Sequence, residues 1–339
     1  MDNIVCFVDP AEWTGDNIVS GEGWKHILAP GEIGSLVNMA GRIEEKTGGD
    51  ENGLLQLRTD DFDLGEFSPR LDMIYDGLKN GPGLALIRGL PVDRLTTFET
   101  AAIYWGIGRH LGEARPNNPQ GDMLGHITDL GKTQSDPKSR GYQTREAMDY
   151  HCDQCDIVGL ICIRTAKSGG VSKVASSVAM HNDLVREHPD MAQALSEPLC
   201  WTKHGEHSVE ELPYYESPVF NALGGKLCTS FGPKHILKGH DLPGTPDLTD
   251  LHRQAIETAE NIANRNRLEM ELKPGDMQFL NNYVTLHTRS AFVDHDEPDR
   301  KRLLWRLWLM NPDLRERTGY TKQWEKGVVL GLGKPRIAV

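Results

Sequence analysis

Apolar residues recur at three- and four-residue spacing in residues 69–79, 97–111 and 248–263. This spacing places them on one face of an amphipathic helix, so the pattern predicts a helix in each segment. Thr96 or Thr97 can cap the second helix, because a threonine hydroxyl accepts a hydrogen bond from the backbone of the first turn.

Short apolar runs predict strands where β-branched residues or alternation replace the helical spacing. These runs are residues 84–89, 157–163, 171–178, 268–272, 277–280 and 303–310. Gly169 and Gly170 form a turn between the second and third runs, so we expect these two strands to pair as a hairpin. Helices that lie early and between strand clusters favour an α+β fold with a mainly antiparallel sheet.

The two ends of the chain are more polar than its middle. Residues 1–70 are rich in turn-forming residues, and we expect an N-terminal elaboration packed on the core. Residues 71–315 hold the predicted helices and strands and form one domain, and residues 316–339 are expected to be a polar, glycine-rich tail. A chain of 339 residues is long for one hydrophobic core and too short for three.

The composition excludes several classes of partner. The 49 acidic residues outnumber the 37 basic ones, and the net charge of −12 repels nucleic acid and anionic membranes. No run of about 18 apolar residues is present to span a membrane, and residues 1–13 lack the basic segment of a secretory signal. Six cysteines are too few for a disulfide scaffold. We therefore expect a cytoplasmic protein with a small-molecule partner, and the sequence is compatible with a homo-oligomer.

The segment His151-Cys152-Asp153 carries the first candidate chemistry. In an extended segment, residues i and i+2 point to the same side, so His151 and Asp153 can converge on one metal ion. A third ligand must come from elsewhere, and His287 is the best candidate because it ends an apolar segment after a Pro-Gly-Asp turn. Two histidines and one carboxylate suit non-haem Fe(II), which keeps coordination positions open.

Two arginines in the last predicted strand, Arg302 and Arg306, share one face of it. A guanidinium that points inward among Leu and Trp side chains needs an anion, and it binds a carboxylate through two parallel hydrogen bonds. Ser172, in the turn of the predicted hairpin, offers a hydroxyl that can complete such a carboxylate site. An internal salt bridge is the alternative for these arginines.

Taken in order along the chain, these motifs resemble a known family. They are His151-x-Asp153, Gly169-Gly170-x-Ser172, Pro274-Gly275-Asp276, Asn281-Asn282, His287 and Arg302-x-x-x-Arg306. Over residues 75–312, the chain resembles the TauD/TfdA-like, or clavaminate synthase-like, Fe(II)/2-oxoglutarate-dependent dioxygenases. The resemblance implies a double-stranded β-helix, or jelly roll, with helices packed outside. It also implies Fe(II) as cofactor, with 2-oxoglutarate and O₂ as co-substrates.

The resemblance implies roles for individual residues. The three candidate metal ligands match the iron ligands of the family. Arg302 matches the arginine that pairs with the distal carboxylate of 2-oxoglutarate, and Ser172 falls where family members often carry a threonine that touches it. Arg306 matches a second arginine that binds an anionic substrate group in some members. The 15-residue interval from His287 to Arg302 is longer than in the archetype, which leaves open which arginine reaches the co-substrate.

The implied reaction couples the conversion of 2-oxoglutarate to succinate and CO₂ with oxidation of an unactivated C–H bond. Hydroxylation is the expected outcome, with desaturation or cyclisation as alternatives. Arg306 favours a small carboxylate-bearing substrate. Arg115 and Asn117 lie in a region where family members place substrate-binding residues, and Tyr142, nine residues before His151, is a further candidate.

Other interpretations use the same segment differently. Cys152 and Cys155 have the Cys-x₂-Cys spacing of zinc and thioredoxin-like redox sites, but structural zinc needs a second ligand pair and the other cysteines are isolated. A jelly roll can also lose its chemistry and act as a binding module, yet here the complete triad and the arginine occur together. Among the remaining histidines, His204 and His207 are candidates to border the site, and His126 is a candidate to face the substrate. His235 and His240 belong either to a lid or to a surface segment.

Overall fold

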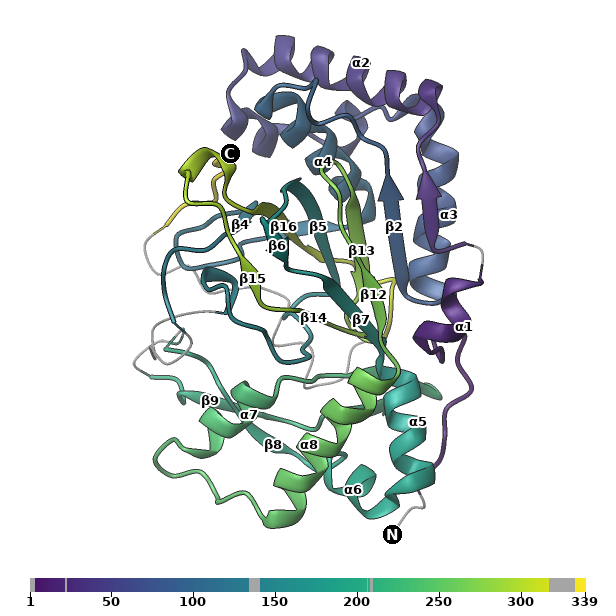
Figure 1. The fold of residues 1–339 in the computed structure, drawn as a ribbon, viewed down its shortest axis with the longest axis vertical. Coiled ribbons are helices and arrows are strands. Elements are labelled where there is room, and N and C mark those ends of the chain that lie inside the picture. Colours follow the sequence, from purple (N-terminus) through teal and green to yellow (C-terminus); the bar gives the residue numbers. More distant parts are fainter. Residues whose placement is uncertain (1–3, 22, 134–140, 206, 208–209, 317–332) are drawn as a thin grey trace.

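The computed structural model describes residues 4–21, 23–133, 141–205, 207, 210–316 and 333–339 (Figure 1). Its helices are α1 (Gly15–Val19), α2 (Pro30–Thr47), α3 (Ser68–Asn80), α4 (Thr97–Leu111), α5 (Ser177–Glu187), α6 (Pro189–Ala194), α7 (Pro233–His240) and α8 (Asp250–Arg265). The three predicted helices are confirmed as α3, α4 and α8, and Thr96 caps α4 by accepting a hydrogen bond from the Glu99 backbone at 3.0 Å. Within the described residues, no helix has both the length and the apolar character needed to cross a membrane.

The strands follow the predicted pattern closely. They are β1 (Lys25–Ile27), β2 (Leu84–Arg88), β3 (Glu113–Arg115), β4 (Gly125–Ile127), β5 (Ile157–Arg164), β6 (Ser168–Gly169), β7 (Ser172–Ser176), β8 (Leu199–Thr202), β9 (Tyr214–Ser217), β10 (Phe220–Leu223), β11 (Lys226–Thr229), β12 (Leu268–Met270), β13 (Met277–Asn281), β14 (Thr285–Arg289), β15 (Phe292–Val293) and β16 (Leu303–Met310). The six predicted strands are found as β2, β5, β7, β12, β13 and β16.

Most of these strands form two sheets. The larger sheet has the order β1-β2-β13-β5-β16-β3, with β4 also paired to β16, and every pair except β1–β2 is antiparallel. The smaller sheet has the order β12-β7-β14 and is antiparallel throughout. The fold is therefore α+β with a jelly-roll core and helices outside, as the sequence and the resemblance indicate.

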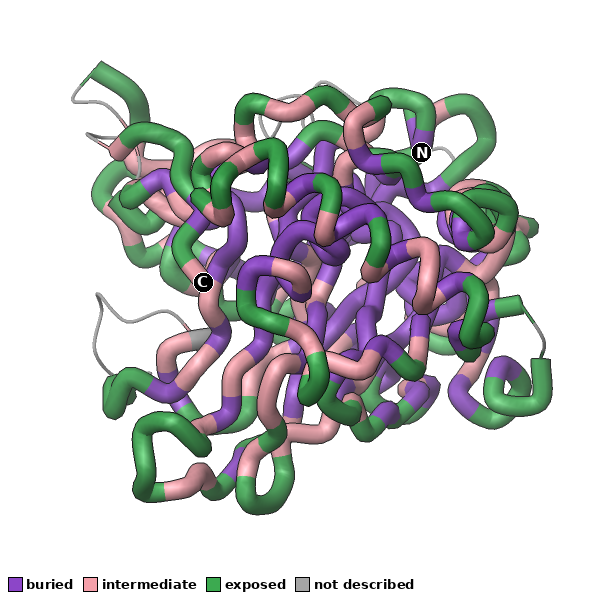
Figure 2. The backbone as a smooth tube through the Cα atoms, turned by 90° about the horizontal axis from the view of Figure 1, so that it is seen from above, coloured by how far each residue is buried: buried purple, intermediate pink, exposed green. Residues whose placement is uncertain are grey.

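The two faces of β16 show how the core is divided. Trp305, Leu307 and Leu309 point outward and join the apolar cluster of the outer helices. Gly108 lets α4 approach this face, because a Cβ there would lie 2.6 Å from Leu307 Cδ1. Trp308 points inward and packs with apolar residues of β7 and β12. Buried residues accordingly gather in the middle of the molecule, inside the exposed periphery (Figure 2).

The N-terminal segment contributes more to the core than its polarity indicates. The buried side chains of Leu36, Met39, Ala40 and Ile43 pack α2 against the core beside α4 (Figure 1). β1 adds a parallel strand to the edge of the larger sheet. The described part of this segment therefore extends the sheet as well as covers it.

The hairpin predicted from the Gly169-Gly170 turn is wrong. β5 pairs with β13 and β16 in the larger sheet, whereas β7 pairs with β12 and β14 in the smaller one. Both glycines have positive φ, at 77° and 69°, so the backbone turns sharply as predicted. The turn leads the chain from one sheet to the other, and the glycines alone do not distinguish this crossover from a hairpin.

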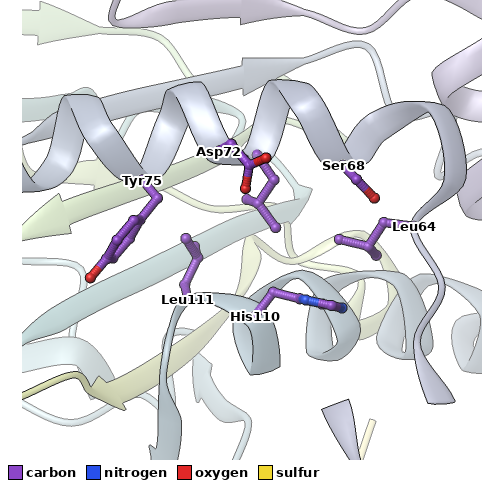
Figure 3. Close-up of a pocket in the computed structure, with 7 residues that line it drawn as sticks. Leu64, Ser68, Asp72, Tyr75, His110 and Leu111 are labelled. Carbon is purple, nitrogen blue, oxygen red and sulfur yellow. The ribbon is translucent and has the colours of Figure 1, made fainter. Parts of the chain in front are cut away.

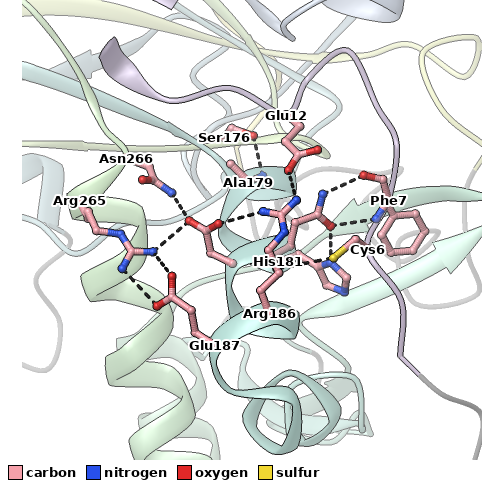
Figure 4. A network of polar contacts seen from close by, with 12 residues as sticks. Cys6, Phe7, Glu12, Ser176, Ala179, His181, Arg186, Glu187, Arg265 and Asn266 are labelled. Carbon is pink, nitrogen blue, oxygen red and sulfur yellow. Dashed lines mark hydrogen bonds and ion pairs between the residues drawn. The ribbon is translucent and has the colours of Figure 1, made fainter. Parts of the chain in front are cut away.

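The first described residues run across α5 (Figure 4). The Phe7 N–H donates to Asn182 Oδ1, and Asn182 Nδ2 donates back to the Phe7 carbonyl, both at 2.8 Å. Glu12 forms an ion pair with Arg186 at 2.9 Å. The same network continues to α8, so the N-terminal segment, α5 and α8 are joined at one end of the molecule.

The predicted C-terminal tail is described only in part, because residues 317–332 lie outside the described residues. The last seven residues, 333–339, return to the core. Ile337 is buried, and Arg336 forms an ion pair with Asp122 at 2.6 Å. This end of the chain is therefore packed on the jelly roll.

Candidate metal centre

Three ligand-type side chains converge between β14 of the smaller sheet and β16 of the larger one. His151 forms an isolated antiparallel bridge with His287, in which the backbone N–H groups donate to the opposite carbonyls at 3.1 and 2.9 Å. Asp153 follows two residues later. One ligand atom from each of the three side chains lies within 4.8 Å of the other two. The fold therefore brings the predicted triad together.

Both imidazoles can offer a nitrogen lone pair. His151 Nδ1 lies 2.9 Å from the Asp149 carbonyl oxygen, which places the ring proton on Nδ1 and leaves Nε2 as the ligand atom. Burial, and then the neighbouring His151 ring, lower the pKa of His287 to about 3. Its ring is therefore neutral at neutral pH, which is the form that binds a metal.

The Asp153 carboxylate is anionic and closely surrounded by donors. Burial alone would raise its pKa, but the charge of Arg306 and the neighbouring groups outweigh burial and hold the pKa of Asp153 at about 2. Arg306 Nη1 donates to both carboxylate oxygens at 3.2 Å, and Trp308 Nε1 donates to Oδ2 at 2.9 Å. His287 Nε2 lies 3.8 Å from Oδ2. The carboxylate thus faces the imidazoles with its charge balanced by Arg306.

Hydrogen bonds fasten the segment that carries Asp153 to the segment before β14. The Asp153 N–H donates to Asn282 Oδ1 at 3.4 Å, and Asn282 Nδ2 donates to the Cys155 carbonyl at 2.9 Å. The Tyr283 hydroxyl donates to the buried carboxylate of Asp156. We call Asn282, Tyr283 and Asp156 the clasp. It joins the two ligand-bearing segments through the chain's own hydrogen bonds.

A second polar site lies at the other end of the inner face of β16. Arg302 is only 6% exposed, and its Nη1 has no hydrogen-bond partner among the described residues. Its Nε lies beside Gly170, where a Cβ would be 3.1 Å away. Ser172 Oγ donates to Gln278 Oε1 at 2.8 Å, and Gln278 Nε2 also lacks a described partner. Buried donors without acceptors are costly, so this site fits an anion such as a carboxylate.

Arg289 belongs to the same region and was missed in the sequence. It is in register with Ser172 across β14 and β7, and its Nη1 donates to the Glu146 carbonyl at 2.7 Å. Burial, and then the nearby charge of Arg302, lower the pKa of Arg289 to about 10. Two neighbouring buried guanidinium groups make this end of the site strongly positive. The sequence did hold a signal for Arg289: it lies two residues after His287, so the two side chains share one face of the same strand.

Comparison with known proteins identifies the family. A sequence model described as "Taurine catabolism dioxygenase TauD, TfdA family" matches residues 50–308, which is most of the chain. The chain belongs to the TauD/TfdA family. FR-33289 synthase of Streptomyces rubellomurinus is 32% identical over 308 residues, which cover 88% of each chain. The taurine hydroxylase-like protein SAT17 of Stachybotrys chartarum is 28% identical over 331 residues, covering 94% of this chain and 84% of that relative.

Solved structures extend the likeness of this TauD/TfdA protein to its fold. Asparagine oxygenase, in complex with Fe(II), 2S,3S-3-hydroxyasparagine and succinate, superimposes with a TM-score of 0.68 at 17% identity, covering 88% of this chain and 98% of that one. The non-haem iron oxygenase OrfP, in complex with Fe and alpha-ketoglutaric acid, gives a TM-score of 0.64 at 16% identity, covering 84% and 93%. At these identities the likeness concerns the fold.

The family and the triad together define the class of enzyme. The protein is a non-haem Fe(II)- and 2-oxoglutarate-dependent dioxygenase that uses O₂. The resemblance, the enzyme class and the co-substrates expected from the sequence are confirmed. The competing zinc or redox role of Cys152 and Cys155 finds no support, because burial raises the pKa of the Cys152 thiol to about 12 and keeps it protonated.

In this TauD/TfdA protein, the predicted substrate residues differ from one another in their contacts. Asn117 is buried, and its Oδ1 accepts a hydrogen bond from Arg306 Nε at 2.9 Å. Arg306 thus forms the internal salt bridge that the sequence left as an alternative. Arg115 pairs with Glu113 at 2.6 Å, on the strand next to β16. The side chain of Tyr142 lies outside the described residues. The structure therefore leaves the substrate contacts as predictions.

The other candidate histidines are placed as follows. His126 does not face the triad: it is in register with Trp305 and stacks on that ring at 6.2 Å, on the outer face of the larger sheet. An alternating strand sends neighbouring side chains to opposite faces, so the prediction depended on the register of β4. His204 Nε2 and His235 Nε2 lie 3.2 Å apart and link the loop after β8 to α7.

A separate cavity of about 120 Å³ lies beside α3 and the end of α4 (Figure 3). It is lined by Leu64, Ser68, Leu71, Asp72, Tyr75, His110 and Leu111. Because α3 and α4 pack on the outer face of the larger sheet, this cavity lies across the sheet from the triad. It is not part of the metal centre.

Proposed function

We propose that His151, Asp153 and His287 bind the iron of this dioxygenase, which hydroxylates an unactivated C–H bond of a small, carboxylate-bearing substrate. The convergence of the three ligand atoms within 4.8 Å carries the proposal. The set also fits on chemical grounds, since two neutral imidazoles and one anionic carboxylate form the 2-His-1-carboxylate donor set of non-haem Fe(II) oxygenases.

Iron and 2-oxoglutarate together supply the O₂-dependent oxidation of the C–H bond, with release of succinate and CO₂. The protein holds the ligands in place, and burial keeps the His287 imidazole neutral. His151 is oriented by the Asp149 carbonyl, and the bridge to His287 fixes the spacing of the two rings. Three protein ligands leave the other coordination positions open.

The distal carboxylate of 2-oxoglutarate is assigned to Arg302, with Ser172 beside it. The Arg302 guanidinium lies 5.2 Å from the centre of the Phe292 ring, which limits its movement. A carboxylate here would accept the hydrogen bond that Arg302 Nη1 does not make among the described residues, and Gln278 Nε2 offers one more donor. The pairing of Arg306 with Asp153 supports Arg302 in this role.

The substrate is proposed to be an amino acid or a related small carboxylate. The names of two structural neighbours support this class, because they refer to hydroxyasparagine and hydroxyarginine bound to oxygenases of the same fold. Within this chain, Arg306 lies beside the proposed iron ligand, and Arg115 shares the inner face of the larger sheet. These two cations, with Asn117 and Tyr142, remain the predicted substrate contacts.

Desaturation or cyclisation would use the same iron centre. Product analysis separates the outcomes, because hydroxylation adds one oxygen atom whereas desaturation and ring closure each remove two hydrogen atoms. Hydroxylation is preferred because the molecules named in complex with the structural neighbours are hydroxylated amino acids.

The test combines metal content with co-substrate turnover. Asp153→Ala should lose stoichiometric Fe(II) binding and all substrate-stimulated succinate release, because two imidazoles alone hold iron weakly. The measurement is iron content after anaerobic loading and desalting, followed by succinate release with a panel of amino acids and other small carboxylates.

The matched control is Asp149→Ala. Asp149 lies in the same segment, but its side chain pairs with Lys234 at 3.1 Å and its contribution to His151 is a backbone carbonyl. This variant should keep both iron and activity. Full iron binding by Asp153→Ala would refute the ligand assignment, and succinate release that no carboxylate stimulates would refute the substrate class.

A further inference from the structure

Three hydrogen bonds converge on the carboxylate of Asp153. Oδ1 accepts one, from Arg306 Nη1 at 3.2 Å. Oδ2 accepts two, from Arg306 Nη1 at 3.2 Å and from Trp308 Nε1 at 2.9 Å. A carboxylate offers about four lone-pair sites, two on each oxygen. The two donors therefore engage both oxygens, and Oδ2, which accepts the indole N–H, is also the oxygen that lies 3.8 Å from His287 Nε2.

Trp308 is well placed to keep this arrangement. Its side chain is only 4% exposed and packs in the apolar cluster between the two sheets. The Arg306 guanidinium carbon lies 4.6 Å from the centre of the Trp308 ring, so the two donors to Asp153 also support each other. Arg306 is in turn held by Asn117 Oδ1 at 2.9 Å. The indole N–H therefore has a fixed direction relative to the carboxylate.

We propose that Trp308 is a positioning residue that holds the Asp153 carboxylate in the orientation in which it faces the two imidazoles. This inference rests on the proposed role of Asp153 as an iron ligand. The indole N–H and the guanidinium hold the carboxylate from the side of β16 and restrict its rotation. A ligand that its neighbours orient before the metal arrives binds that metal more tightly. The N–H of Trp308 thus contributes to metal affinity through Asp153.

The test is Trp308→Phe, which keeps an aromatic ring beneath Arg306 and removes only the N–H donor and part of the ring. Titration with Co²⁺, without 2-oxoglutarate, should show an affinity lower by about tenfold, as is typical when a hydrogen bond to a metal ligand is removed. The visible absorption of the Co²⁺-loaded variant should also change, because the ligand field of Co²⁺ depends on how the Asp153 carboxylate is oriented. A residue that only fills space would leave this spectrum unchanged.

The matched control is Trp305→Phe. Trp305 lies on the same strand and is equally buried, but it points to the outer face, and its Nε1 has no hydrogen-bond partner among the described residues. We expect unchanged Co²⁺ affinity and spectrum for this variant. Equal effects of the two substitutions would overturn the inference, because a general loss of packing would then explain both.

A measurement on the unaltered protein covers the case in which Trp308→Phe does not fold. The chain has seven tryptophans, so ¹⁵N-tryptophan labelling gives few indole N–H signals. Zn²⁺ should shift one of them strongly, because a metal bound to Asp153 draws electron density from the carboxylate that accepts the Trp308 hydrogen bond. If no indole signal moves when Zn²⁺ binds, the inference is wrong.

The two proposals fail in different ways. If Asp153→Ala binds Co²⁺ like the unaltered protein, the ligand assignment fails and the inference falls with it. If Asp153→Ala loses the metal but Trp308→Phe keeps both the affinity and the spectrum of the unaltered protein, only the inference about Trp308 is overturned.

Discussion

The inner face of β16 carries an arginine at each end, and the two arginines differ in whether the protein pairs them. Arg306 is fully engaged: it contacts the carboxylate of Asp153 and the amide of Asn117. Arg302, four residues earlier and about 13 Å away along an extended strand, is as deeply buried but keeps a donor without a described partner. Burial alone therefore does not tell which arginine binds a ligand.

The difference lies in whether the protein itself supplies the anion. At the Arg306 end, Asp153 balances the charge, so the arginine orients a group of the protein. At the Arg302 end, Arg289 is a neighbouring cation, and the carboxylate of Asp294 acts on Arg302 without a side-chain ion pair between them among the described residues. A buried cation is costly unless it is paired. We infer that the co-substrate completes the Arg302 end, whereas folding completes the Arg306 end.

The largest effect is expected from substituting Arg302, at the end of β16 where the described part of the protein supplies no paired anion. Arg302→Ala should raise the 2-oxoglutarate concentration needed for half-maximal binding by about tenfold to a hundredfold, because a charge-assisted bidentate contact is lost. Metal affinity should stay unchanged. The measurement is an anaerobic titration of the Fe(II)-loaded protein with 2-oxoglutarate, followed by its weak visible charge-transfer band.

Arg302→Lys serves as the conservative variant. Lysine keeps the charge but not the planar fork of donors, so it should restore only part of the affinity. If Arg302→Ala instead altered only the KM of the prime substrate, the co-substrate role would pass to Arg306 and the contrast between the two ends would be reversed.

A smaller effect, on a different quantity, is expected at the other end. Arg306→Gln removes the cation that keeps Asp153 anionic and oriented, so the affinity for Fe(II) or Co²⁺ should fall by about tenfold. The affinity of the metal-loaded protein for 2-oxoglutarate should change much less. A loss of prime-substrate affinity and coupling with unchanged metal affinity would mean that Arg306 is a substrate anchor, as the family resemblance suggested.

The smallest effects form a matched pair. Ser172→Ala removes a neutral hydroxyl beside Arg302, and Asn117→Ala removes a neutral acceptor beside Arg306. Each should weaken one constant by about fivefold, since a hydrogen bond of this kind contributes about 1 kcal/mol. In the same two titrations, Ser172→Ala should lower only the affinity for 2-oxoglutarate. Asn117→Ala should lower only the affinity for the metal. If both variants altered both constants alike, the two ends would not be independent.

Much of the fold could be predicted from local pattern. The predicted strand over residues 303–310 matches β16, and α4 begins directly after its Thr96 cap. α2 was missed because Gly31, Gly34 and Gly41 interrupt its apolar spacing and read as turn formers. The false hairpin at residues 157–178 has a different cause, because pairing partners are set by contacts between distant strands and not by the turn.

The same distinction between local pattern and contacts across the fold applies to the site. The triad was found because the i and i+2 spacing of His151 and Asp153 is local, and only His287 had to come from a distant segment. The contact between Trp308 and Asp153 depends on how β16 lies against the ligand segment, which no local pattern encodes. The bond between Asn117 and Arg306 likewise depends on the path of a loop. Sequence therefore indicates the ligands more readily than the groups that orient them.

The clasp has a consequence for metal exchange. Asn282, Tyr283 and Asp156 connect the ligand-bearing segments through hydrogen bonds that form when the chain folds. In zinc-finger peptides, by contrast, the metal itself organises the chain, and its removal unfolds the domain. Here the ordering of the ligands is a part of folding rather than of metal uptake. We therefore expect loss of iron and its reloading to be reversible events at one site of a folded protein, where different divalent ions compete for the same preformed geometry.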